Sequence, residues 1–180
     1  MEAQTLGTPG SERNYFNFTL FEFSEDATLV QPFDAMPVRH IDPDDYRLQP
    51  NGSMTNITSV LEAVRDRVKA VIETIRQHPN RKDHPLPLVI LVTDGCHNSG
   101  PPPEAVAEEI KSMEVDGDHV TLAVAGVTVG NSDLDEPMMH RIASDGCYMR
   151  VEDVNKLRQF LAVVGSSSGG PHREIQDLRG

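Results

Sequence analysis

Tryptophan is absent from this 180-residue chain, and aromatic residues together make up only 5% of it. We therefore expect a core of aliphatic side chains with a few phenylalanines. The chain is long enough to form one domain with a buried core. No apolar run approaches the roughly 20 residues of a membrane-spanning helix, and the first residues lack the basic start and apolar stretch of a secretion signal. A cytoplasmic domain is the expectation.

Basic residues are scarce compared with acidic ones. The chain has 16 Lys and Arg against 28 Asp and Glu, which gives a formal net charge of −12. Nucleic acids and anionic membranes are normally bound by a basic face, so this balance argues against both as partners. It is compatible with divalent-cation binding, although solubility is the simpler explanation.

Cysteine is also rare, with only Cys96 and Cys147 present. They do not make a disulfide framework. Cys96 follows a predicted strand and Cys147 precedes another, so we expect them at opposite ends of a sheet, too far apart to bridge. Cys96 beside His97 raises the alternative of a hydrolase-like enzyme using Cys96 and Asp94. Neighbouring residues on an extended chain point apart, however, so His97 is poorly placed to activate Cys96.

Hydrophobic patterns alternate between strand-like and helix-like segments along residues 15–165. The apolar run at 88–93 is typical of a parallel strand buried on both faces, and Ser59 with Glu62 forms a capping-box pattern at a helix start. The full set comprises strands at 16–23, 28–31, 88–93, 120–127 and 148–151, and helices at 59–75, 103–113, 134–143 and 154–164. Flexible polar ends are expected at 1–14 and 166–180. This order predicts an α/β domain with a doubly wound, mostly parallel sheet.

The candidate functional residues lie at one end of this expected sheet. Ligands on such sheets bind beyond the carboxyl ends of the strands. Asp94 and Gly95 directly follow the strand at 88–93, and Thr55 and Asn56 precede the helix that should begin on the same side.

Two segments there resemble part of a known family. Residues 51–57 and 88–95, in that order, are similar to two of the three metal-site segments of a von Willebrand factor A domain. The segments from 120 to 168 look like the second half of a bacterial A domain of the tellurite-resistance and stress-operon type. The resemblance covers roughly residues 15–168. It implies a Rossmann-like fold and a protein-interaction module without catalysis.

The same resemblance implies a metal-ion-dependent adhesion site. In that family a divalent cation, often Mg²⁺, sits at the top of the sheet and leaves one position open for a carboxylate of a partner protein. By this resemblance Thr55 and Asp94 are the metal ligands here, and Asn56 and Gly95 shape the loops around them. Their hydroxyl and carboxylate oxygens suit Mg²⁺ or Mn²⁺.

The third metal-site segment of the family, Asp-x-Ser-x-Ser after an N-terminal strand, is absent from this chain. It supplies most of the family's side-chain ligands. Mg²⁺ normally keeps several waters and dehydrates reluctantly, so Thr55 and Asp94 alone should hold it only weakly.

The missing segment is structural as well. In the family its strand lies between those matching residues 16–23 and 88–93, so its omission leaves two inner strand edges unpaired. Each buried unsatisfied backbone group costs roughly 1–3 kcal/mol, against a total stability of about 5–15 kcal/mol. Three explanations follow: the two strands pair directly, another chain donates a strand, or the reading frame starts late. Residues 1–14 contain no apolar run, and we favour a late start or a degenerate copy. A structural subunit completed by a partner's strand is the remaining functional alternative.

Overall fold

The computed structural model describes residues 15–16, 19–31, 36–37, 54–79, 86–94, 96–128 and 134–166. The flexible end expected at 1–14 lies outside these ranges, as do Gly95, residues 32–35 and 38–53 and most of the polar end expected at 166–180.

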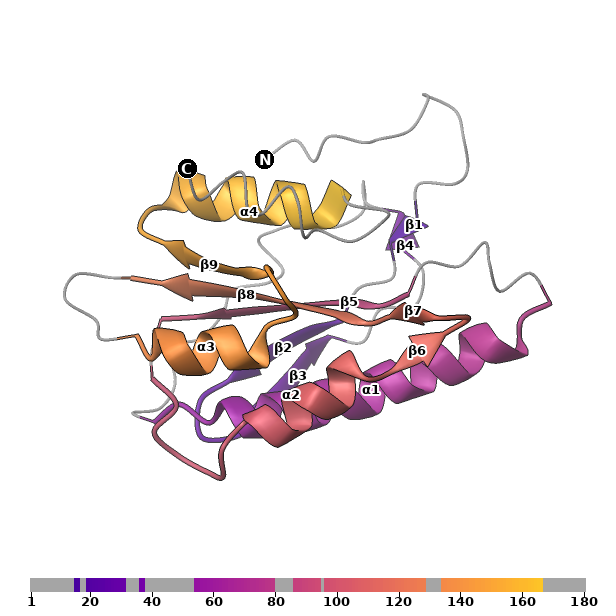
Figure 1. The fold of residues 1–180 in the computed structure, drawn as a ribbon, viewed down its shortest axis with the longest axis horizontal. Coiled ribbons are helices and arrows are strands. Elements are labelled where there is room, and N and C mark those ends of the chain that lie inside the picture. The colour runs from indigo at the N-terminus through magenta and orange to yellow at the C-terminus, as the bar shows by residue number, and fades with distance from the viewer. Residues whose placement is uncertain are drawn as a thin grey trace.

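A parallel sheet forms the centre of the fold (Figure 1). Its strand order is β5-β8-β9, with β5 at Leu88–Thr93, β8 at Thr121–Val127 and β9 at Tyr148–Val151. β5 and β8 pair in parallel along their length, and β8 pairs in parallel with β9. Parallel neighbours need crossover connections, and helices provide them here. The predicted α/β fold with a parallel sheet is thus confirmed.

Helices cover the two faces of the sheet unequally. They are α1 (Ile57–Gln77), α2 (Glu104–Lys111), α3 (Glu136–Ile142) and α4 (Val154–Ser166). Side chains of α1, α2 and α3 share one buried cluster with Val89 and Leu91 of β5. On the other face, Phe160 and Val164 of α4 pack with Ala123 and Met149 of β8 and β9. Figure 1 shows α4 apart from the other three helices.

The N-terminal strands form pairs separate from the parallel sheet. β2 (Leu20–Phe23) and β3 (Ala27–Gln31) make an antiparallel hairpin, in the region where the sequence predicted strands at 16–23 and 28–31. β1 (Tyr15–Phe16) pairs with β4 (Met36–Pro37). Further along the chain, β6 (Glu114–Val115) and β7 (Asp118–His119) form a short hairpin that the sequence did not predict. Direct pairing between the hairpin and β5, one of the three explanations above, does not occur among the described residues.

The start of α1 differs from the predicted capping box. The helix begins at Ile57, and Asn56 is its N-cap, with Oδ1 accepting a hydrogen bond from the backbone N–H of Ser59 at 3.1 Å. Because Ser59 lies inside the helix and is not its N-cap, its hydroxyl oxygen accepts instead a hydrogen bond from the N–H of Ala27 at 2.9 Å. Ser59 therefore ties the hairpin to α1 and does not begin the helix.

The expectation that β5 is buried on both faces is wrong. Val89, Leu91 and Thr93 are buried, but Leu88, Ile90 and Val92 keep 37%, 37% and 39% of their surface exposed. The reason is that β5 ends the strand order of its sheet, and α4 packs over β8 and β9.

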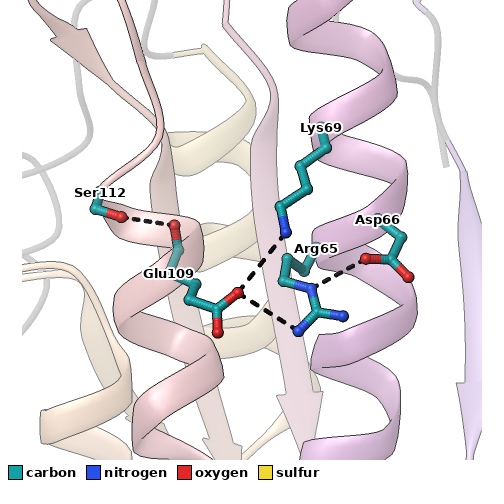
Figure 2. Close-up of polar contacts among 5 residues, drawn as sticks. All are labelled: Arg65, Asp66, Lys69, Glu109 and Ser112. Atoms are coloured by element: carbon teal, nitrogen blue, oxygen red, sulfur yellow. Dashed lines mark hydrogen bonds and ion pairs between the residues drawn. The ribbon is translucent and has the colours of Figure 1, made fainter.

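Polar contacts join α1 to α2 at the surface. As Figure 2 shows, Glu109 lies 3.4 Å from Nη1 of Arg65 and 3.7 Å from Nζ of Lys69, and the Nε of Arg65 donates to Asp66 at 3.0 Å. The hydrogen bond to Asp66 is the main reason that the pKa of Arg65 is raised. Glu109, Lys69 and Asp66 are exposed, so solvent screens these pairs and packing is the main support for the two helices.

Candidate functional site

The loop after β5 is joined to the start of α1 by backbone and side-chain hydrogen bonds. The N–H of Thr55 donates to Oδ1 of Asn98 at 2.7 Å, and the N–H of Asn98 donates to the carbonyl of Thr55 at 3.1 Å. The N–H of Ile57 donates to Nδ1 of His97 at 3.2 Å. The turn of the hairpin joins the same cluster, because the N–H of Asn56 donates to the carbonyl of Ser24 at 2.6 Å. Three segments distant in sequence are thus held together at the carboxyl end of β5.

Gly100 allows this close approach. Its φ of +84° favours glycine, and a Cβ there would lie 2.6 Å from Oδ1 of Asn56, the oxygen that caps α1. A side chain at this position would therefore strain the backbone and displace the cap. The sequence analysis singled out neither Asn98 nor Gly100. The turn-forming segment Asn98-Ser99-Gly100-Pro101 was the signal that could have indicated a tight loop here.

The two proposed metal ligands lie on neighbouring parts of this cluster. Thr55 is half-buried and directly precedes the N-cap of α1, while Asp94 is exposed and directly follows β5. Their oxygens suit a hard cation. Within the described ranges, however, no group of three or more His, Cys, Asp or Glu side chains is placed to hold a metal ion. Thr55 and Asp94 by themselves offer one hydroxyl and one carboxylate, fewer ligands than a complete coordination shell needs.

A half-buried carboxylate at the start of α2 is paired with an arginine of α3. Nε and Nη2 of Arg141 donate to Oε1 of Glu104 at 3.1 and 2.8 Å. These bonds, together with the backbone N–H of Glu104, hold the pKa of this carboxyl below its usual range, and nearby His97 lowers it slightly further. Oε2 of Glu104 and Nε2 of His97 are buried and make no hydrogen bond within the described part of the chain. Glu104 thus places a negative charge at the first residue of α2, where the helix dipole favours it.

The geometry counts against an enzyme that uses Cys96 and His97. Nδ1 of His97 already accepts the N–H of Ile57, and its Nε2 is buried. A general base needs a ring nitrogen within reach of the nucleophile and its substrate. His97 instead acts as a structural acceptor at the start of α1. Cys96 and Cys147 are not disulfide-bonded.

The described helices include none that is both long enough and apolar enough to span a bilayer.

Solved structures of proximal thread matrix protein 1 from the mussel byssus are similar to this chain. One crystal form shares 22% identity with a TM-score of 0.61, over 82% of this chain and 36% of that one. A structure of the same mussel protein with a zinc-occupied MIDAS motif shares 22% identity with a TM-score of 0.63, over 86% of this chain and 37% of that one. At this identity the likeness shows the fold alone, and the chain spans little more than a third of the mussel protein's length.

No curated protein matches the chain. The family model of the von Willebrand factor type A domain matches residues 4–163. The chain therefore belongs to the von Willebrand factor type A domain family.

Proposed function

We propose that this chain is a non-catalytic protein-interaction module that contacts its partner through the loops at the carboxyl end of β5. Domains of this family typically serve interaction or adhesion. The observation that carries the proposal is the mutual hydrogen bonding of Thr55 and Asn98, which holds the α1 start against the loop that follows Asp94. A surface held in one conformation binds at a lower entropic cost than a mobile one.

A divalent cation is a secondary part of this proposal. The similar mussel structure with a zinc-occupied MIDAS motif supports cation binding as a property to test here. Thr55 and Asp94 supply oxygens suited to Mg²⁺ or Mn²⁺, but they fit only part of a coordination shell. We therefore propose that such a cation binds weakly and that an acidic residue of a partner protein is one of the missing ligands.

The narrower assignments of the sequence analysis belong to the same proposal. From the resemblance of residues 120–168 we also propose a bacterial domain of the tellurite-resistance and stress-operon type. The acidic composition supports a protein partner in preference to a nucleic acid or an anionic membrane.

The test is partner capture with matched variants. The purified chain, carrying a photo-cross-linker at an exposed site on α1, is incubated with native cell extract, and cross-linked proteins are identified by mass spectrometry. Asp94→Ala and Thr55→Ala should each remove a specific partner from the captured set. Asp66→Asn, which alters an exposed carboxylate on α1 away from the loops, should retain it. Capture that is equal in all variants would show that these loops are not the binding surface.

Adding EDTA to the same experiment separates the two parts of the proposal. Loss of capture with EDTA would support a bridging cation. Capture that persists in EDTA but is lost in Asp94→Ala would mean direct binding by the loops.

A further inference from the structure

We propose that the carboxylate of Glu104 holds the Nε2–H of His97 and so keeps this ring in the tautomer and orientation that support the start of α1. Glu104 and its partner Arg141 are then positioning residues for the loops of the proposed interaction surface. We call the series Arg141, Glu104, His97 and Ile57 the His97 relay. This inference deepens the proposed function and rests on it, because it names the groups that hold those loops in one conformation.

The first observation is the proton that His97 carries. Its Nδ1 accepts the N–H of Ile57 at 3.2 Å, so this nitrogen has no proton of its own. A neutral imidazole has one N–H, which must therefore be on Nε2. Nε2 is buried and has no acceptor within the described ranges. Because a buried donor without an acceptor is destabilising, we expect an acceptor close to it.

The second observation is the way in which Arg141 binds Glu104. An arginine and a carboxylate frequently pair through two nitrogens and both oxygens. Here Nε and Nη2 of Arg141 both donate to Oε1 of Glu104, at 3.1 and 2.8 Å. Oε2 is buried and accepts no hydrogen bond from the part of the chain that the structure describes. Arg141 thus holds the carboxylate by one oxygen and leaves the other for a second donor.

The third observation places the two side chains near each other. His97 lies in the loop that leads from β5 into α2, and Glu104 is the first residue of α2. This loop is held against α1, because the hydroxyl of Thr58 donates to the carbonyl of Pro101. The hydrogen bond from Arg141 is the main cause of the lowered pKa of Glu104, and His97 is among the groups that lower it further.

The two buried atoms complement each other. Nε2 of His97 is a donor and Oε2 of Glu104 is an acceptor, and each offers what the other lacks. No direct hydrogen bond joins them, and one bound water between them satisfies both. An ionised carboxylate only accepts, so this water donates to Oε2 and accepts from Nε2–H. The imidazole proton therefore stays on Nε2, and Nδ1 stays an acceptor for the N–H of Ile57.

Nuclear magnetic resonance reads the proton on His97 directly. The full chain is isotope-labelled in nitrogen and studied in mildly alkaline solution, where histidine is neutral. In the parent chain we expect a proton on Nε2 that exchanges slowly with solvent. In Glu104→Gln this proton should exchange at least about tenfold faster, because the charged acceptor is gone. A proton on Nδ1 in the parent chain, or an Nε2 proton that Glu104→Gln does not affect, would overturn the proposal.

A matched control removes a different ion pair of α3. Glu136 binds Nη1 of Arg150 through its Oε1 at 2.6 Å. Glu136→Gln therefore removes one carboxylate from an arginine pair, as Glu104→Gln does, but away from His97. The Nε2 proton of His97 should exchange at the parent rate in this variant. An equal acceleration in both variants would reflect general loosening of α3 and would contradict the relay.

A pair of substitutions shows whether Glu104 acts through the imidazole. Asparagine at position 97 can present an amide oxygen near the place of Nδ1 but has no group at the place of Nε2. Exchange of the Ile57 amide is the readout. Glu104→Gln should speed this exchange about fivefold or more when His97 is present. In His97→Asn, the same change should alter it less than about twofold. Equal acceleration in both backgrounds would mean that Glu104 acts without His97, and the relay would be wrong.

These measurements need no partner protein, so the relay and the proposed function can fail separately. If the relay measurements fail while capture that depends on Asp94 persists, this inference falls and the proposed function stands. If Asp94→Ala captures the same proteins as the parent chain, the proposed function falls whatever the exchange rates show. When both hold, Glu104→Gln should also reduce capture of the partner, and Glu136→Gln should retain it. Undiminished capture by Glu104→Gln would show that the relay does not position the interaction loops.

Discussion

Thr55 and Asn98 exchange two hydrogen bonds although they lie far apart in the sequence. The N–H of Thr55 donates to Oδ1 of Asn98 at 2.7 Å, and the N–H of Asn98 donates back to the carbonyl of Thr55 at 3.1 Å. This pair determines how the loop after β5 lies against the start of α1. The candidate interaction surface therefore depends on a side chain that is not itself a proposed ligand.

Asn98→Ala should destabilise the chain by about 1 kcal/mol, because it removes the acceptor of the Thr55 N–H. Urea unfolding followed by circular dichroism measures the change. Asn98→Asp retains an oxygen acceptor at the same position and should recover most of the loss. If both variants unfold like the parent chain, the bond between Thr55 and Asn98 does not contribute to stability.

Gly100→Ala should destabilise the chain more than Gly117→Ala. Both glycines have positive φ, +84° and +90°, so alanine at either position incurs backbone strain of about 1–3 kcal/mol. Only at Gly100 does the added Cβ also meet Oδ1 of Asn56, whereas nothing lies within 4 Å at Gly117. Loss of the Asn56 cap should add about 1 kcal/mol. Equal losses in the two variants, measured by urea unfolding, would show that the contact with Asn56 relaxes without cost.

The ion pair between Glu104 and Arg141 should make stability sensitive to acid. Hydrogen bonds from Arg141 lower the pKa of Glu104 in the folded state, so the folded protein binds a proton there less readily than the unfolded chain. The stabilisation is present above the ordinary carboxyl pKa and is lost as the pH falls through that value toward the lowered pKa of the folded state.

Melting temperatures of the parent chain and Glu104→Gln, measured from neutral pH into the acid range, check this pH dependence. The difference between them should be largest at neutral pH and should shrink as the solution is acidified. Glu73→Gln, on the exposed surface of α1, should change little at any pH. A difference for Glu104→Gln that stays constant across the range would contradict the assignment.

Metal should raise the melting temperature only at high concentration. Mg²⁺ or Mn²⁺ at about a hundred times its dissociation constant would add about 2.7 kcal/mol of stability. Because Thr55 and Asp94 are the only ligands that we propose from this chain, we expect little shift at micromolar metal. We expect a rise at millimolar metal that EDTA reverses and Asp94→Ala abolishes. A rise that persists in Asp94→Ala would place the cation elsewhere. A large shift at micromolar metal would mean that further ligands complete the site.

Much of the fold could be predicted from hydrophobic periodicity. The apolar runs that became β5, β8 and β9 and the helical repeat of α1 are local patterns, and each appears in the structure close to its predicted bounds. The position of Asp94 at the end of a strand and of Thr55 at a helix start follows from the same patterns. Local propensity and turn chemistry determine these features, and both can be read along the chain.

Other features depend on contacts between distant segments. Ser59 looked like a helix cap, but Asn56 takes that role and Ser59 binds the hairpin, because Ala27 comes within hydrogen-bonding distance only in the folded chain. The sequence alone indicated that His97 is poorly placed to activate Cys96 but gave it no other role, whereas in the structure its Nδ1 accepts the N–H of Ile57.

By itself, the sequence determined the order of the strands of the parallel sheet and of the four helices, the acidic composition and the residues at the carboxyl end of β5. Only the tertiary structure decided that one face of β5 is uncovered, because a continuous apolar run reads the same whether one face or both are buried. Burial depends on which strand and helix lie alongside. Here β8 pairs with one edge of β5 and α4 packs over β8 and β9, which leaves the side chains of Leu88, Ile90 and Val92 exposed.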